Sequence, residues 1–367
     1  MPAAMATERS AIAVLGATGF TGRLVAHALR ERRAPLLLAG RSRSRLEALA
    51  RALGGADFAV ARVEDSASLD ALARRARVLI NCAGPFVDLG EPVVRAAIGA
   101  GAHYADTTGE QPFVHDVFAH DSWARERRVA VIPALAFEIA LADCAAALAA
   151  RGLDEVETVE VAYAVRFHAS QGTKRSALRM LERRGLGYGD GRWVEEAPGH
   201  HSAVVELPLG RRAAVSFPGA EVVTIPRHIA ARTVRALMCV PRGVATVAHV
   251  LGPALPALAS SPLGALARRW LGSGTAGPDL ATRRRDTFVI AVDVRGRRAG
   301  SAAARRVMVT GCDPYALTAA IAAQGAIWLA GGEHRCSGVL SPAMAFDPAR
   351  LLDATTSNSV VYTESDM

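Results

Sequence analysis

The stretch AIAVLGATGFTGRLVAHAL, residues 11–29, decides the fold of this chain. It opens with an apolar run typical of a buried strand, continues through a turn with three glycines, and ends in a pattern that places Leu24, Val25, Ala28 and Leu29 on one helical face. Strand, glycine turn and helix in this order form the first half of a βαβ unit. The sequence therefore predicts a parallel sheet that begins at this strand.

The turn itself reads GATGFTG, residues 16–22. Glycines at this point let the backbone approach a pyrophosphate at the helix N-terminus. The spacing is GxxGxxG rather than GxGxxG, so a tight strand–helix turn without a ligand remains the alternative. Its place between strand and helix favours a dinucleotide. We predict that the pyrophosphate is held by Gly16, Thr18, Gly19, Phe20, Thr21 and Gly22.

The next predicted strand ends in AGRSRSRLEAL, which places Arg41, Ser42 and Arg43 at its tip. A fold that binds NAD has an acidic residue there for the ribose hydroxyls. A guanidinium instead gives a 2′-phosphate charge-assisted, bidentate hydrogen bonds, and Ser42 adds a hydroxyl donor. The tip favours NADP(H) over NAD, and the alternative is that these arginines solvate a loop of an arginine-rich chain.

Short apolar runs alternate with helical periodicity as far as Ala134, which predicts a doubly wound Rossmann domain over residues 1–138. NCAGPF follows the fourth strand and YADTTGE the fifth, at the carboxyl edge where such folds bind ligands. Glu110 is expected to cap the next helix. Contacts to the ribose and nicotinamide are predicted from Cys82, Ala83, Gly84, Pro85, Phe86, Asp106 and Thr107.

Strict alternation from Val159 to Phe167 marks a different pattern, and we predict a second, α+β domain over 139–310. VVELPLGRRAAVSF indicates a hairpin, and TFVIAVDVRG can pair with RRVMVTG, so its sheet should be mostly antiparallel. Residues 243–267 are nearly uncharged but contain three prolines. This segment predicts either a helical hairpin that is buried or faces a dimer partner, or an apolar entrance that touches lipid or an apolar substrate. The stretch GSGTAG, 272–277, predicts a flexible connector.

Composition narrows the classes of function. The five cysteines are scattered without a CxxC pair, and no histidine pattern suits a metal, so we expect neither disulfides nor a catalytic metal. The N-terminus lacks the features of a secretion signal, which favours a cytoplasmic protein. The net charge of +8 is spread without a dense basic block, so no nucleic-acid partner is expected. Membrane contact is the lesser alternative, and a homodimer through the second domain is compatible with its sheet.

Several motifs together resemble a known family: GATGFTGRLVA, AGRSRSRLEAL, VLINCAGPF, GEPVVRAAIGAGAHYADTTGE and SQGTKRSAL are similar to saccharopine dehydrogenase-like oxidoreductases, including trans-acting enoyl reductases. The match covers most of the chain, and the similar ending implies that a C-terminal segment, 311–367, returns to the Rossmann domain. The resemblance implies NADP(H) and chemistry at a C=N or activated C=C bond. The chain departs at PALAFEIALADC, 133–144, where family members usually carry Gly-Phe-Asp and Pro-Ser-Asp and here Phe137, Glu138 and Asp143 remain.

Three residues are candidates for catalysis. Thr107 follows the fifth strand, Lys174 lies in the turn SQGTKRSAL and is the sole lysine, and Tyr163 lies in the alternating strand. A lysine can act as general acid because burial lowers its pKa, whereas an exposed position is the alternative. Tyr163 is equally compatible with a core role. The short-chain dehydrogenase mechanism is excluded because no tyrosine is followed by a lysine four positions later.

These patterns predict an NADPH-dependent reductase of an activated C=C bond in a small-molecule or carrier-bound acyl substrate. The apolar segment suits an acyl chain, and a basic surface suits an acidic carrier protein. The alternatives are a reductase of imines or amino acids and a non-catalytic NADP-binding sensor or scaffold.

Overall fold

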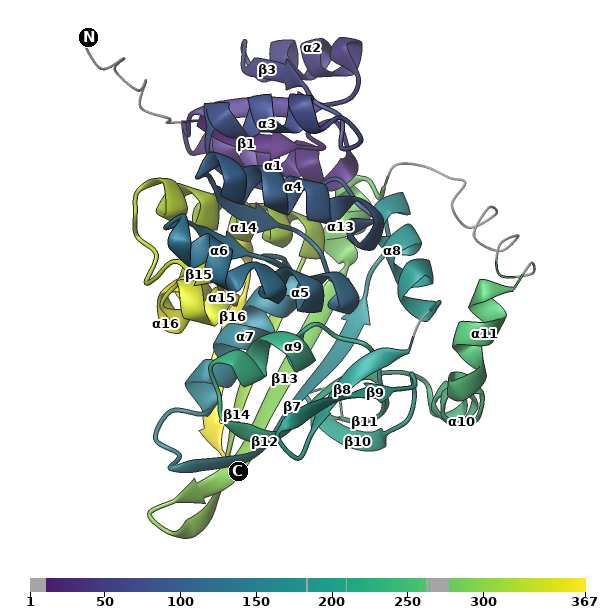
Figure 1. Cartoon of the computed structure of the whole chain (residues 1–367). Coiled ribbons are helices and arrows are strands. Elements are labelled where there is room, and N and C mark those ends of the chain that lie inside the picture. The colour runs from purple at the N-terminus through teal and green to yellow at the C-terminus, as the bar shows by residue number, and fades with distance from the viewer. Residues whose placement is uncertain (1–10, 183, 209, 262–263, 265–276) are drawn as a thin grey trace.

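Two sheets organise the chain, as the computed structural model in Figure 1 shows. The structure describes residues 11–182, 184–208, 210–261, 264 and 277–367. The predicted connector GSGTAG lies outside the described residues except for Gly277. Residues 262–263 and 265–267 of the apolar segment also lie outside them. The predicted combination of a Rossmann domain and a second α+β domain is confirmed.

The first sheet is parallel and has the order β15-β6-β5-β4-β1-β2-β3. The strand order reverses between β1 and β4, and a dinucleotide binds at such a switch point in doubly wound folds. The strands are β1 (Ala11–Leu15), β2 (Leu36–Gly40), β3 (Asp57–Val60), β4 (Ala76–Asn81), β5 (His103–Asp106), β6 (Ala130–Ile132) and β15 (Gly338–Val339). The helices between them are α1 (Phe20–Glu31), α2 (Arg43–Ala52), α3 (Ser66–Arg75), α4 (Phe86–Ala100), α5 (Gln111–Val117), η1 (Phe118–His120) and α6 (Asp121–Glu126).

The second sheet has the order β10-β11-β12-β7-β13-β14-β16, and β8 and β9 pair beside β12. All of its neighbours run antiparallel except β7 and β12, which are parallel. The strands are β7 (Glu155–Arg166), β8 (Gly185–Gly189), β9 (Arg192–Glu196), β10 (Ser202–Leu207), β11 (Gly210–Ser216), β12 (Ala231–Cys239), β13 (Thr287–Arg298), β14 (Ser301–Cys312) and β16 (Val361–Asp366). Its helices are α8 (Gln171–Leu181), α9 (Glu221–Thr224), η2 (Ile225–Arg227), α10 (Arg242–Leu251), η3 (Gly252–Ala254), α11 (Leu255–Ser260) and α13 (Leu280–Arg285).

The C-terminal segment serves both sheets. Helix α14 (Pro314–Ala330) packs against α1, β4 and β5, and β15 extends the first sheet beside β6, so the predicted return to the Rossmann domain is confirmed. The chain then passes through α15 (Pro342–Ala345), α16 (Pro348–Asp353) and η4 (Thr356–Asn358). Its last strand, β16, pairs with β14 of the second sheet, which the sequence did not predict.

Helix α7 (Phe137–Ala149) lies at the centre of the molecule. It is apolar on nearly every side, and it contacts β13 and β14 of the second sheet as well as α14, α15 and α16. A helix that is apolar all round is stable only where it is covered all round. The position of α7 therefore fixes the two domains against one core.

Two details of the helices concern Pro92 and the apolar segment 243–267. Pro92 lies inside α4, which begins at Phe86. The apolar segment forms α10 and α11, on which Val244, Val247, Leu251 and Leu258 are at least half exposed. Within the described part of the chain, no helix has both the length and the apolar character needed to cross a bilayer.

Asp143, on α7, ties three separate segments together. Its Oδ1 lies 2.9 Å from Nε2 of His228, and its Oδ2 accepts a hydrogen bond of 2.9 Å from the backbone N–H of Ala343. The side chain is fully buried. Burial alone would raise the pKa of Asp143, but His228 and these hydrogen bonds together hold it below its usual value. A lowered pKa means that the carboxylate stabilises the fold above its ordinary pKa and that this stabilisation is lost as the pH falls through the lowered value.

Replacing Asp143 by alanine is expected to reduce the free energy of unfolding by about 3 kcal/mol near neutral pH, because one partner of a buried pair is removed. The difference from wild type should shrink in strong acid, where the wild-type carboxyl is also protonated. Urea denaturation at both pH values measures this, with the exposed Asp70→Ala as the matched control. A difference that stays constant in acid would contradict the ion-pair role.

Candidate cofactor and substrate site

The turn between β1 and α1 is closed so tightly that only glycine fits at two of its positions. Gly16 has φ +80°, and a Cβ there would lie 2.9 Å from the carbonyl carbon of Cys82. A Cβ on Gly22 would lie 2.2 Å from the carbonyl oxygen of Gly16. Both neighbours are backbone atoms and cannot move aside. The glycines thus allow the first turn of α1 to pack directly on β1 and on the loop after β4.

The N-terminus of α1 has no side-chain cap among the described residues, and its N-cap is Gly19. The carbonyl oxygen of Thr18 accepts from the side chains of Arg45 (3.0 Å) and Arg23 (3.4 Å), which fixes the turn from outside. The first-turn N–H groups remain available for an anion, as phosphate binding at a helix N-terminus requires. The ring of Phe20 packs edge-on against Tyr315 of α14, with centroids 4.9 Å apart.

The three residues at the tip of β2 differ in how their side chains are engaged. Arg43 lies 3.6 Å from Glu47 and over the ring of Phe58. Ser42 is the N-cap of α2. Arg41 is exposed, and within the described part of the chain its guanidinium has no hydrogen bond or ion pair. Arg41 is thus the cation at this tip that is free to meet a 2′-phosphate.

The loop after β4 runs beside the glycine turn. The backbone N–H of Cys82 donates to the carbonyl of Leu15 (2.9 Å), and Oδ1 of Asn81 accepts from the N–H of Ala83 (2.9 Å). Burial raises the pKa of the Cys82 thiol to about 12, so it is neither a nucleophile nor an acid at neutral pH. Gly84 is exposed and joined to Pro85 by a cis peptide bond. Residues 82–84 therefore remain partly accessible at the carboxyl end of β4, beside the switch point between β1 and β4.

Glu110 was expected to cap its own helix, and the structure corrects this. The residue occupies the N-cap position of α5 but its side chain does not cap that helix. Its two carboxylate oxygens instead accept from the N–H groups of Phe86 (3.0 Å) and Val87 (2.8 Å), at the start of α4, and from the hydroxyl of Ser176. The reason is spatial: β4 and β5 are neighbours, so the loops that follow them meet. Ser176 lies on α8, so this contact joins the second domain to the sheet edge.

Asp106 ends β5 and is fully buried. Its Oδ1 accepts from the N–H groups of Thr108 (3.0 Å) and Ala134 (2.8 Å), while Oδ2 has no hydrogen-bond partner among the described residues. Burial raises the pKa of Asp106 to about 7 against these hydrogen bonds. Asp106 therefore positions the loops after β5 and β6. Thr107 is half-buried beside Cys82.

The other two catalytic candidates lie in different surroundings. Lys174 is exposed on the first turn of α8, and no partner for its ammonium exists in the described chain. Tyr163 is buried, and its hydroxyl donates to Glu221 of α9 and approaches the carbonyl oxygen of Glu138 at 3.2 Å. The catalytic roles of Thr107, Lys174 and Tyr163 remain predictions.

Sequence reasoning missed two residues that connect this region. Tyr315, at the start of α14, accepts from the N–H of Ser170 (2.7 Å) and lies 2.9 Å from the hydroxyl of Thr173, so it joins the cap of α8 to Phe20. Glu221 is fully buried beside Tyr163. Glu221 lies in no motif, and Tyr315 lies in the C-terminal stretch GCDPYALTAAIAA, which was predicted only to return to the Rossmann domain. The tertiary structure brings both residues to the site.

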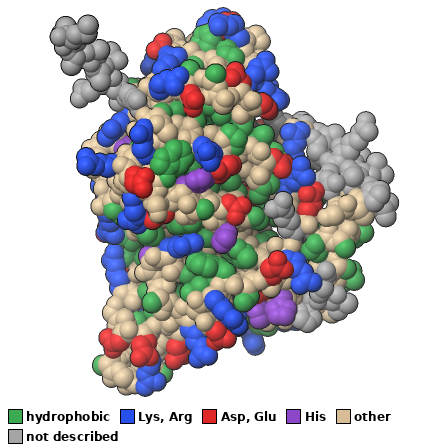
Figure 2. Space-filling model, viewed as in Figure 1, with side chains coloured by type: hydrophobic (Ala, Val, Ile, Leu, Met, Phe, Trp, Pro, Cys, Tyr) green, Lys and Arg blue, Asp and Glu red, His purple; other side chains and the backbone are tan. Residues whose placement is uncertain are grey.

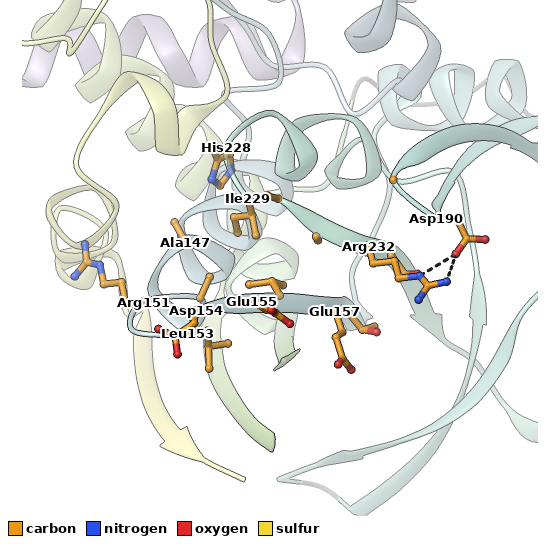
Figure 3. A pocket seen from close by; sticks show the side chains of 17 residues that line it. Ala147, Arg151, Leu153, Asp154, Glu155, Glu157, Asp190, His228, Ile229 and Arg232 are labelled. Carbon is orange, nitrogen blue, oxygen red and sulfur yellow. Dashed lines mark hydrogen bonds and ion pairs between the residues drawn. The ribbon is translucent and has the colours of Figure 1, made fainter. Parts of the chain in front are cut away.

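A separate groove of about 1250 Å³ lies away from the dinucleotide turn (Figure 3). It is bounded by the end of α7, the starts of β7 and β12, and the turn between β8 and β9. Arg232 of β12 and Asp190 of that turn form an ion pair of 2.9 Å. None of the residues predicted to bind cofactor or substrate lines it. The groove is thus distinct from the candidate site.

The strand order of the first sheet, the glycine turn and the exposed Arg41 are together typical of a dinucleotide-binding protein. Residues 12–132 match the family model described as the saccharopine dehydrogenase NADP binding domain. Over these residues the chain is similar to that domain, and the match supports NADP(H) as the cofactor.

Two curated relatives are similar to part of the chain. The chain is 37% identical over 130 residues to a human saccharopine dehydrogenase-like oxidoreductase, an alignment that covers 30% of each protein. It is 38% identical over 135 residues to a trans-acting enoyl reductase of Mycobacterium leprae, covering 35% of this chain and 32% of the relative. These alignments thus span about a third of the relatives' lengths. The whole fold is similar to that of yeast saccharopine dehydrogenase (L-Glu forming), with a TM-score of 0.63, 13% identity, and coverage of 98% of this chain and 100% of that one.

Proposed function

We propose that the protein is an NADPH-dependent reductase that transfers a hydride to the activated C=C bond of an acyl substrate. The observation that carries this proposal is the match to an NADP-binding domain, together with the similarity of part of the chain to trans-acting enoyl reductases. The hydride needs an electrophile held against the nicotinamide. Helix α8 contacts the sheet edge through Ser176 and Arg179, which supports a role of the second domain in holding that electrophile.

The surface supports an acyl substrate bound to a carrier. Val244, Val247, Leu251 and Leu258 give α10 and α11 an exposed apolar face that suits an acyl chain. The chain carries a formal charge of +8, which favours encounter with an acidic carrier protein. Basic and acidic side chains are interspersed over the face shown in Figure 2, so the attraction would be diffuse rather than centred on one basic block.

A panel of substrates tests the proposal. The purified protein and NADPH are mixed with medium- and long-chain enoyl thioesters and, in parallel, with imines formed from amino acids and oxo acids, and the absorbance of NADPH is followed. We expect oxidation with the enoyl thioesters, and a much lower rate when NADH replaces NADPH.

The other outcomes each favour a different function. Oxidation of NADPH with imines alone would favour the alternative function, a reductase of C=N bonds. NADPH binding without turnover across the whole panel would favour a sensor or scaffold.

A further inference from the structure

Three carboxyl groups lie near the carboxyl edge of the first sheet beyond β4, and two of them are engaged with backbone N–H groups. Asp106 holds the N–H groups of Thr108 and Ala134, and Glu110 holds those of Phe86 and Val87. Both side chains are fully buried. A group occupied in this way holds loops together, and it is poorly placed to give a proton to a substrate.

Glu138 is the third carboxyl, and its environment differs. It lies on the first turn of α7, directly after the loop that leaves β6. A Cβ built on Gly109 would come within 2.9 Å of its Oε1, so the carboxyl lies against the loop that follows Thr107 and Thr108. Glu138 is only half-buried, and no other side chain in the described chain forms a hydrogen bond or ion pair with its carboxyl. The carboxyl lies near the predicted nicotinamide loop, and it is held by the backbone N–H of its own residue rather than by another side chain.

Glu221 is a buried acidic residue, and Tyr163 links it to the backbone of Glu138. The hydroxyl of Tyr163 approaches the carbonyl of Glu138 and donates to Oε1 of Glu221. Oε2 of Glu221 and the hydroxyl of Thr224 are buried without a partner among the described residues, so this pocket holds more polar atoms than the protein satisfies. Such a pocket retains protons or water.

The titration of the two carboxyls is compatible with this arrangement. Burial raises the pKa of Glu138 to about 7, and the charge of Glu221 raises it further in the same direction. Burial likewise raises the pKa of Glu221 to about 7, against the hydrogen bond from Tyr163. The other titratable group that acts on Tyr163 and Glu221 is Asp143 of α7, which is paired with His228. Each carboxyl is thus partly protonated near neutral pH, and the charge of Glu221 favours the protonated form of Glu138.

We propose that Glu138 is a catalytic acid that gives a proton to the substrate when the nicotinamide gives the hydride, and that Tyr163 and Glu221 are positioning residues behind it. The inference rests on the proposed function. When bound, NADPH would supply a hydride, with two electrons, for the β-carbon of the enoyl thioester and would leave as NADP⁺. The O–H bond of Glu138 breaks as a C–H bond forms at the α-carbon, which leaves a saturated thioester and a carboxylate. Solvent then returns the proton to Glu138.

The variant Glu138→Gln tests the role, because it keeps the shape of the side chain and removes the acidic proton. With the full-length protein, NADPH and a trans-2-decenoyl thioester, we expect the rate of NADPH oxidation to fall about 100-fold or more, as the loss of a general acid predicts. The affinity for NADPH should stay unchanged. The matched control Glu64→Gln, at an exposed position, should keep the wild-type rate.

The pH profile separates a catalytic role from a structural one. An acid must be protonated to act, so the wild-type rate should fall as the pH rises above about 7, and this alkaline limb should be absent from Glu138→Gln. Glu221→Gln removes the neighbouring charge that raises the pKa of Glu138, so the limb should move to lower pH. Glu138→Asp should retain a limb and part of the rate.

Each result decides between the proposals. A wild-type rate in Glu138→Gln would overturn the role of Glu138 while leaving the reductase intact. If Glu138→Gln does not fold, an alkaline limb that is unmoved in Glu221→Gln would overturn it equally. A wild-type protein that binds NADPH but oxidises it with none of the panel would remove the proposed function, and this inference with it.

Discussion

Replacing Gly22 by alanine is expected to weaken the binding of NADPH by about 100-fold or more, which corresponds to about 3 kcal/mol. The added Cβ would lie 2.2 Å from the carbonyl oxygen of Gly16, 2.8 Å from its carbonyl carbon and 3.0 Å from Cα of Ala17. All three are backbone atoms, so α1 must move away from β1. The N–H groups of its first turn then move with it, and they are the groups predicted to hold the pyrophosphate. Calorimetric titration with NADPH measures the loss.

Gly99→Ala is the matched control for this effect. Gly99 lies inside α4, and a Cβ there would meet only the ring of Trp123, at the ordinary contact distance of 3.8 Å. Its affinity for NADPH should equal that of wild type. Thermal unfolding of both variants shows how much folded protein each titration contains. A folded Gly22→Ala that binds NADPH normally would show that the turn does not hold the cofactor.

Local patterns carried enough information to predict most of the fold. The alternation of apolar runs and helical faces predicted the order of strands and helices in the first sheet, because each pattern depends on residues close together in the chain. The two hairpins, β10 with β11 and β13 with β14, were predicted for the same reason. The glycine turn was recognisable because its geometry tolerates so few residue types.

The contacts that complete the site could not be predicted, because they join distant residues. Glu110 reaches Phe86, Tyr163 reaches Glu221, and Tyr315 reaches Ser170 across 145 positions of sequence. No periodicity or spacing encodes such pairs. The parallel pairing of β7 with β12 and the return of β16 to the second sheet are long-range features of the same kind. Sequence reasoning thus proposed residues for the candidate site but not the long-range contacts between them.

Replacing Arg41 by aspartate is expected to weaken NADPH binding by about 100-fold and to change NADH binding by less than about threefold. A charge-assisted pair with the 2′-phosphate contributes about 1.5–3 kcal/mol, and a carboxylate at the same place repels that phosphate. NADH has no 2′-phosphate, and its ribose hydroxyls can donate to a carboxylate. Titrations with both nucleotides at one ionic strength measure the change, since screening affects the phosphate contact.

Arg43→Asp separates recognition by Arg41 from the general effect of charge. It makes the same change of net charge two positions further along, but Arg43 is already engaged with Glu47 and Phe58, whereas Arg41 has no such partner in the described chain. If the guanidinium of Arg41 contacts the 2′-phosphate, Arg41→Asp must lose far more NADPH affinity than Arg43→Asp. Equal losses in the two variants would mean that the nucleotide meets only a diffuse positive field, and equal losses for NADPH and NADH would mean that the tip of β2 does not select the cofactor.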